Sequence, residues 1–189
     1  MNPNGTVWLA SGSPRRRQIL THLGFSLDIR PADVDETPLP NEHPVAYTLR
    51  VSADKARSAP GDRVVLAADT TVHMDDRFFH KPESRDEARE HLLALSGRTH
   101  LVSTGVCVRR GDDVRSFAIT SDVTLRSLDE REIDAYLATG EADDKAGAYG
   151  IQGLGGMLVA HVNGSWTNIM GLPAEAVVEP LLALGATRW

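Results

Sequence analysis

The chain has 189 residues, of which 41% are hydrophobic and 24% charged, and its formal net charge is −6. This composition is typical of a folded globular protein and not of a disordered one. The negative charge argues against a general DNA or RNA coat, because binding a phosphate backbone requires a basic face. The single cysteine, Cys107, excludes an internal disulfide, and its alternating surroundings favour an inert core thiol over a nucleophile.

No repeat, low-complexity stretch or linker interrupts the sequence, so we expect one domain over residues 1–189. The longest apolar run, Val64–Ala68, is far too short to cross a bilayer, and the N-terminus lacks a signal-peptide core. We therefore expect a cytoplasmic protein with neither a membrane nor a nucleic-acid partner.

The first third of the chain alternates between short strands and helices. The predicted elements are a strand over Thr6–Ala10, a helix from Pro14 to about Gly24, a strand over Ser26–Arg30, an acidic loop over 31–43 and a helix from Pro44 to about Ser58.

The remaining elements are more strand-rich. They are a buried strand over Val64–Ala68, a hairpin of Thr71–Met74 and Arg77–His80, helices that begin at capping boxes at Ser84 and Ser127 and end at Gly97 and Gly140, a long hairpin of His100–Arg109 and Val114–Leu125, a strand over Leu158–Val162 and a helix over Pro173–Leu184. Because strands and helices interleave without strict β-α-β order, the sequence predicts an α/β fold around a twisted mixed sheet.

The segment Ser11-Gly12-Ser13-Pro14-Arg15-Arg16-Arg17 places three arginines in the first turn of a helix. A helix start carries partial positive charge and favours acidic residues there, so this arrangement is locally unfavourable. A bound anion would reverse that effect, and serine hydroxyls, backbone N–H groups and guanidinium groups all suit phosphate oxygens. The alternative is a solvated basic turn.

Several acidic and basic residues are candidates for chemistry. Asp69 directly follows the buried strand and could be a general base or a ligand of a hard metal ion, or it could cap the next turn. The acidic loop, which contains Glu36, could supply further metal ligands or be simply exposed. Lys55, late in its helix, and Lys81, before a proline, could contact an anion or be solvated.

The segment from Asp143 to Gly156 contains five glycines within ten residues. Such density indicates close backbone approach or left-handed conformations, but it matches neither dinucleotide- nor phosphate-loop fingerprints. A purely structural glycine loop is the alternative. The sequence also lacks a G-x-S-x-G elbow and closely spaced histidine pairs, which gives no sign of a serine hydrolase or a transition-metal site.

Taken together and in this order, these segments resemble the Maf family of nucleoside triphosphate pyrophosphatases. The resemblance covers practically the whole chain and rests on Leu9–Arg16, Val34–Pro38, Arg50 with Asp54–Ala56, Ala68–Thr70, Lys81-Pro82, Gly147–Gly153 and Gly171–Pro173.

The resemblance implies a fold similar to that of inosine triphosphate pyrophosphatases and cleavage between the α- and β-phosphates of a nucleotide. It assigns Asp69 as acceptor of the water proton and Glu36, with Asp69, as ligands of Mg²⁺ or Mn²⁺. The positions that it gives to phosphate binding and catalysis are Ser11, Ser13, Arg15, Lys55 and Lys81. The resemblance also leads us to expect a homodimer.

Three positions separate the branches of this family. Arg15, Thr70 and Gln152 resemble the branch that acts on dTTP and UTP, whereas the branch that acts on 7-methyl-GTP tends to carry tryptophan, glutamine and glutamate. An amide can pair with both the O4 acceptor and the N3–H donor of uracil or thymine. Two alternatives are a non-catalytic nucleotide-binding regulator of septum formation and a hydrolase of another phosphorylated metabolite.

Overall fold

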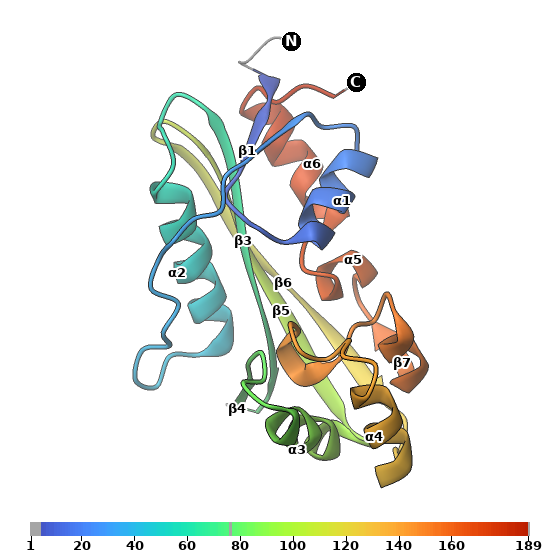
Figure 1. The fold of residues 1–189 in the computed structure, drawn as a ribbon. Helices are drawn as coiled ribbons and strands as arrows, with labels where there is room; N and C mark the ends of the chain where they lie inside the picture. Colours follow the sequence, from blue (N-terminus) through green and yellow to red (C-terminus); the bar gives the residue numbers. More distant parts are fainter. Residues whose placement is uncertain (1–4, 76, 189) are drawn as a thin grey trace. The chain divides into compact units, whose positions relative to one another are not determined.

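A computed structural model of the chain describes residues 5–75 and 77–188 (Figure 1). In chain order its strands and α-helices are β1 (Val7–Leu9), α1 (Pro14–His22), β2 (Leu27–Ile29), α2 (Pro44–Arg57), β3 (Val64–Met74), β4 (Arg77–Phe79), α3 (Arg85–Leu95), β5 (Thr99–Arg110), β6 (Asp113–Leu125), α4 (Glu130–Leu137), β7 (Val159–Asn163), α5 (Trp166–Ile169) and α6 (Ala174–Ala183). Two 3₁₀ turns, Ala146–Ala148 and Leu154–Leu158, lie in the glycine-rich segment.

The strands form one mixed sheet in the order β2-β1-β3-β5-β6-β7, with β4 paired to β3. The strand β1 runs parallel to both β2 and β3, while β4 pairs with β3 and β7 with β6 in antiparallel fashion. The predicted α/β fold with a twisted mixed sheet flanked by helices is thereby confirmed. No helix in the described ranges is long and apolar enough to cross a membrane.

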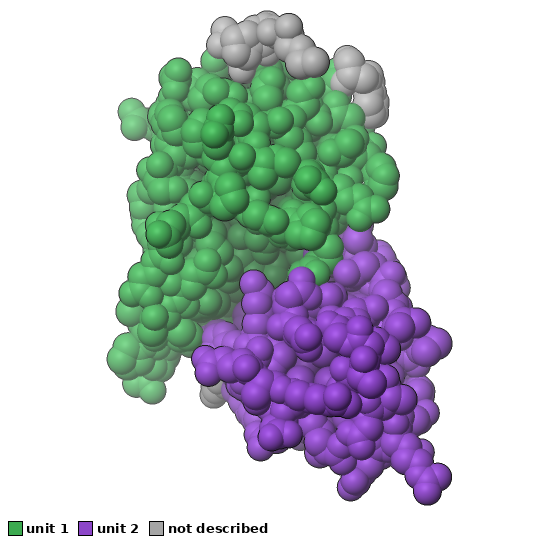
Figure 2. Space-filling view, in the orientation of Figure 1, with its two compact units in different colours: residues 1–70, 104–119, 171–189 green, residues 71–103, 120–170 purple. Residues whose placement is uncertain are grey.

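The chain divides into two compact units, which Figure 2 shows in green and purple. Unit 1 comprises residues 1–70, 104–119 and 171–189, and unit 2 comprises residues 71–103 and 120–170. The expectation of a single domain over residues 1–189 is not tested by this division and stays a prediction.

In unit 1, α2 lies on one side of the strands and α1 and α6 lie on the other (Figure 1). Small side chains allow α2 to approach the sheet closely, among them Ala56 on the helix and Ala67 and Cys107 on the strands. Cys107 is a free, buried thiol whose pKa is raised by burial, which confirms it as a core residue. The helix α2 also approaches the sheet closely at Gly105, where a Cβ would lie 2.4 Å from the carbonyl oxygen of Thr48.

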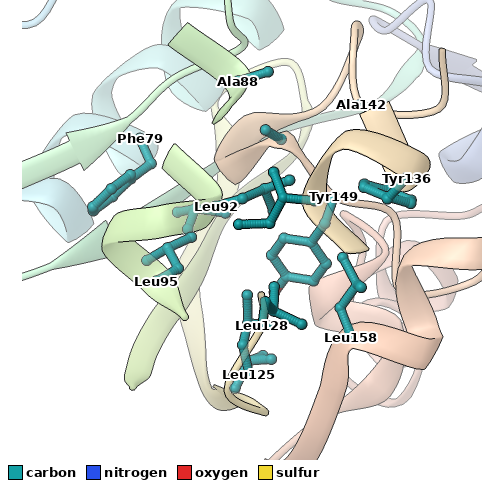
Figure 3. Packing of buried hydrophobic residues seen from close by; sticks show 14 of the residues in the cluster. Phe79, Ala88, Leu92, Leu95, Leu125, Leu128, Tyr136, Ala142, Tyr149 and Leu158 are labelled. Carbon is teal, nitrogen blue, oxygen red and sulfur yellow. The ribbon is translucent and has the colours of Figure 1, made fainter. Parts of the chain in front are cut away.

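Unit 2 has its own apolar core, shown in Figure 3. Leu92 and Leu95 of α3 are fully buried in this core. They share it with Phe79 of β4, Tyr136 of α4 and Tyr149 of the glycine-rich segment. Apolar residues three apart on a helix lie on one face, which explains why α3 packs along that line. The core therefore joins the glycine-rich segment to regular secondary structure.

Three local predictions differ from the structure. The strand that begins at Val64 continues to Met74, so Asp69 lies inside a strand and not after one. The fourth helix is capped by Asp129, whose capping box with Glu132 replaces the one predicted at Ser127. At the third helix Ser84 accepts from the backbone N–H of Glu87 as predicted, but the Glu87 carboxylate accepts from Glu83 in return, one residue before the cap.

Candidate active site

A buried ion pair lies at the centre of the candidate site in unit 1. The ammonium of Lys55, on α2, donates to Oδ1 of Asp69 at 2.8 Å, and both side chains are 9% exposed. The same ammonium lies 2.9 Å from Oε1 of Glu36, in the acidic loop. The structure thus brings together three residues that the sequence analysis placed in three separate segments.

Asp69 retains one free carboxylate oxygen. Its Oδ1 is bound by Lys55, and no residue in the described part of the chain donates to its Oδ2. A carboxylate oxygen without a donor can accept a proton from water. The geometry is therefore compatible with a general base held in place by Lys55.

Asp69 and Thr70 point to opposite faces of β3, since side chains alternate along a strand. Asp69 contacts α2 through Lys55, whereas Thr70 contacts α1 through Arg16. The pairing of β3 with β1 ends at Leu66, so both residues lie on a stretch of β3 beyond that pairing. Because β1 does not pair with this stretch of β3, the loop that follows β1 can reach side chains on both faces of β3.

Arg16 is a buried arginine that joins three segments of the chain. Its Nε donates to the carbonyl oxygen of Gly171 at 2.8 Å, and its Nη1 donates to Oγ of Ser11 at 3.0 Å. Its Nη2 donates to Oγ1 of Thr70 at 3.0 Å, and that hydroxyl also shares a hydrogen bond with Thr104. Burial lowers the pKa of Arg16, and the negative charge of Asp69 partly opposes that shift.

The loop after β1 is shaped by its own serines. Ser13 is the N-cap of α1, where its hydroxyl accepts from the backbone N–H of Arg16, and Pro14 fills the first helical position. Ser11 accepts from the backbone N–H of Ser13 as well as from the Arg16 guanidinium. Both hydroxyls keep a proton to donate, so they can still contact an anion while they hold the loop.

The acidic loop that carries Glu36 is held by α2. The hydroxyl of Tyr47 donates to the backbone carbonyl of Glu36 at 2.9 Å. Arg50 makes a paired contact with Glu42, at 2.7 Å from each carboxylate oxygen, and these hydrogen bonds lower the pKa of Glu42. Such bidentate pairs restrict the motion of both partners, so the loop that carries Glu36 is held in place against α2.

The remaining predicted site residues belong to unit 2 or lie on the rim of unit 1. Arg15 is half-buried at the start of α1. Lys81 and Gln152 are exposed residues of unit 2. Within the described residues, the Gln152 side chain has no hydrogen-bond partner, so its amide is free to bind a ligand.

The carboxylates of the candidate site would bind a metal ion only together with a substrate that supplies further ligands. No cluster of three or more histidine, cysteine, aspartate or glutamate side chains is arranged to hold a metal within residues 5–75 and 77–188. Glu36 and Asp69 nevertheless converge on one cationic atom. Mg²⁺ commonly takes one or two carboxylates and completes its shell with water and phosphate oxygens, and these residues suit that pattern.

Arg16 is the site residue that sequence reasoning missed. Of the three consecutive arginines, the family resemblance assigned a role to Arg15 and none to Arg16. The available signal was the helical position of Arg16, which places it three residues before the buried Ile19 and four before the buried Leu20. An arginine on the buried stripe of a helix must find acceptors inside the protein.

The fold and these side chains define an α/β protein with a buried acid–base pair next to a basic, hydroxyl-rich loop. The chain belongs to the Maf family: the family model described as Maf-like protein matches residues 6–184.

Several curated relatives are similar over nearly their whole length, and each is named dTTP/UTP pyrophosphatase. The protein of Anaeromyxobacter dehalogenans is 51% identical, over 94% of this chain and 93% of that one. The protein of Chromobacterium violaceum is 47% identical over 98% of both chains. Among solved structures, the Ham1 protein of Staphylococcus aureus matches 64% of this chain and 71% of that one with a TM-score of 0.43 and 14% identity, too distant a likeness to support any conclusion.

Proposed function

We propose that this protein hydrolyses nucleoside triphosphates, with dTTP and UTP preferred, to a nucleoside monophosphate and pyrophosphate. The observation that carries the proposal is the buried pair of Lys55 and Asp69, in which one carboxylate oxygen is bound and the other is free. Relatives at 47% and 51% identity that are named for this activity support the choice of substrate.

Asp69 is the residue that accepts the proton of the attacking water. Its Oδ1 is fixed by Lys55, so its Oδ2 has one orientation in which to meet a water molecule. Proton transfer by a positioned carboxylate contributes about 10²–10⁴-fold to a rate. Lys55 then serves two purposes, since it orients the base and supplies positive charge for the phosphates.

The phosphates bind where the hydroxyls and the cations of unit 1 meet. Ser11 and Ser13 donate their hydroxyl protons from the loop before α1, and Arg15 extends from the first turn of that helix. Phosphoryl transfer depends chiefly on positioning and on charge neutralisation, for which these groups are suited. Lys81 supplies a further positive charge from unit 2.

A divalent cation, Mg²⁺ or Mn²⁺, completes the site. The charges of Asp69 and Glu36 are balanced by those of Lys55 and Arg16, so a triphosphate would add negative charge that this cluster alone does not neutralise. Glu36 and Asp69 would hold the ion together with phosphate oxygens and water. When bound, it supplies the missing positive charge and polarises the phosphate.

Gln152 and Thr70, with Arg15, select the base. The exposed amide of Gln152 offers one donor and one acceptor, which complement O4 and N3–H of uracil and thymine. Thr70 is held by hydrogen bonds to Arg16 and Thr104, so its position is fixed before substrate binds. We further propose that the enzyme acts in the cytoplasm, on small-molecule nucleotides and not on nucleic acid; the homodimer expected from the family resemblance stays a prediction.

The experiment is a panel of nucleoside triphosphates incubated with Mg²⁺ or Mn²⁺, with products identified by ³¹P NMR. We expect UMP or dTMP with pyrophosphate from UTP or dTTP, and no reaction after exhaustive chelation. UDP with orthophosphate as first products would refute cleavage between the α- and β-phosphates. Full activity after chelation would refute the metal. Nucleotide binding without any turnover would instead support the alternative function, a non-catalytic regulator of septum formation. The relatives' names do not favour that alternative.

A further inference from the structure

A single carboxylate, Glu141, anchors the glycine-rich segment of unit 2. Glu141 follows Gly140, which ends the α4 region with a φ of +73°. Its Oε2 accepts from the backbone N–H of Leu154 at 2.8 Å, and its Oε1 accepts from that of Gly155 at 2.8 Å. One side chain thus holds two consecutive backbone N–H groups that lie more than ten residues further along the chain.

The hydroxyl of Tyr136 extends this anchor to the other side of the segment. It donates to Oε1 of Glu141 at 3.0 Å and accepts from the backbone N–H of Gly150 at 3.1 Å. Tyr136 is itself buried in the core of unit 2 (Figure 3). The backbone is therefore fixed two residues before Gln152, at Gly150, and two residues after it, at Leu154.

The glycines of this segment make room for the anchor. A Cβ at Gly153 would lie 2.2 Å from Oε2 of Glu141, and one at Gly155 would lie 2.8 Å from the hydroxyl of Tyr136. At Gly150 a Cβ would lie 2.7 Å from Cε of Lys145. These contacts account for much of the glycine density, which the sequence analysis connected with close backbone approach.

Glu141 is held in its charged form. Burial acts to raise its pKa, but the backbone N–H groups of Gly155 and Leu154 and the Tyr136 hydroxyl outweigh that effect, so the pKa is lowered. A charged acceptor makes stronger hydrogen bonds than a neutral one. An amide in its place would present an NH₂ group to at least one of these donors.

We propose that Glu141 is a positioning residue for base recognition: together with Tyr136 it fixes the backbone on both sides of Gln152, so that the exposed amide is presented to the nucleotide from a preorganised loop. This inference rests on the proposed function for the role of Gln152, while the anchoring itself rests on the contacts within unit 2. Preorganisation strengthens binding because a loop that is already ordered loses less entropy when the ligand arrives.

The first test follows amide hydrogen exchange residue by residue in Glu141→Gln, Tyr136→Phe and the control Glu90→Gln, which alters an exposed glutamate on α3. In Glu141→Gln we expect exchange at Leu154 and Gly155 to rise by about tenfold or more. In Tyr136→Phe the increase should centre on Gly150. Unchanged exchange at Leu154 and Gly155 in Glu141→Gln would overturn the anchoring.

The second test asks whether Glu141 acts through Gln152. The dissociation constant of UTP, as an analogue with a non-hydrolysable imido link between the α- and β-phosphates, is measured by calorimetry with Mg²⁺ for wild type, Glu141→Gln, Gln152→Ala and the double variant. We expect Glu141→Gln to weaken binding by about tenfold in the wild-type background and by less than about twofold in the Gln152→Ala background. Equal effects in both backgrounds would show that Glu141 is merely structural. If the wild type binds UTP but does not hydrolyse it, the proposed activity fails while this inference stands; if it binds no UTP, the role in base recognition fails.

Discussion

The ammonium of Lys55 and Oδ1 of Asp69 lie 2.8 Å apart inside unit 1, although the two residues belong to a helix and a strand on separate stretches of the chain. This pair fixes the orientation of the carboxylate and leaves its other oxygen available. It also provides the sharpest test of the proposed chemistry, because the carboxylate can be changed without a change in volume.

Asp69→Asn should lower kcat for UTP by about 10²–10⁴-fold, because the amide cannot accept the proton of water. Binding of UTP should survive, since the side chain keeps its size and its hydrogen bond from Lys55. Steady-state kinetics and calorimetry separate the two effects. The matched control is Asp62→Asn, an exposed carboxylate outside the acidic loop and the candidate site. A variant that retains most of its activity would remove Asp69 from the mechanism.

Arg16→Lys should reduce both thermal stability and kcat/KM for UTP, whereas Arg17→Lys, at an exposed position of the same turn, should change neither. The ammonium of a lysine cannot reproduce the planar set of bonds to Gly171, Ser11 and Thr70. Each lost hydrogen bond from a charged group costs about 1.5–3 kcal/mol. Thermal unfolding of both variants at one pH measures the difference, and identical melting temperatures would contradict the bridging role.

Gln152→Glu should lower kcat/KM for UTP and dTTP by roughly 5- to 150-fold, which corresponds to about 1–3 kcal/mol for an unpaired polar group. The carboxylate has no donor for O4, so a guanine nucleotide, whose N1–H and N2–H₂ both donate, should lose less or gain. The comparison uses UTP, dTTP and 7-methyl-GTP, with Gln18→Glu as the control at another exposed glutamine. An equal loss on all three nucleotides would make Gln152 structural or generally catalytic.

His100 should make the protein less stable as the pH falls below neutrality. Burial lowers its pKa to about 4, and its Nε2 shares a 2.8 Å hydrogen bond with Tyr149. In the unfolded chain this histidine binds a proton near pH 6.5, whereas in the folded protein it does not. Its contribution to the free energy of unfolding is therefore complete above pH 6.5 and is lost as the pH falls toward 4. Between pH 7 and 5 the loss is about 2 kcal/mol.

Denaturant unfolding at pH 7 and pH 5 measures this effect. His100→Gln, which cannot titrate but can still bond to Tyr149, should lose less stability over that interval than the wild type, by about 2 kcal/mol. His161→Gln, at an exposed histidine of β7, should behave like the wild type. The same pH dependence in all three proteins would contradict a neutral, buried His100.

Gly105→Ala should destabilise the protein by about 1–3 kcal/mol, because overpacking forces neighbouring backbone to shift. The added methyl group would meet the backbone of Thr48 on α2 at 2.4 Å. Gly61→Ala is the control, since a Cβ there has nothing within 4 Å. Because α2 also carries Lys55, we expect Gly105→Ala to lower kcat as well. A melting temperature equal to that of Gly61→Ala would contradict the close packing of α2.

The sequence by itself determined most elements and their order. Apolar alternation identified the strands, and Pro14, Pro44 and Ser84 identified helix starts, because caps and periodicity act between residues a few positions apart. The resemblance carried by the ordered motifs also identified the family, which the match over residues 6–184 confirms.

Only the tertiary structure decided which residues of those motifs act together. Asp69 was predicted at a strand end, but pairing with neighbouring strands extends β3 to Met74 and turns Asp69 toward Lys55 and Thr70 toward Arg16. The bond from Arg16 to Gly171 joins residues 155 positions apart. Local propensity carries no information about such contacts, since a buried guanidinium finds its acceptors only when the sheet and its helices have packed.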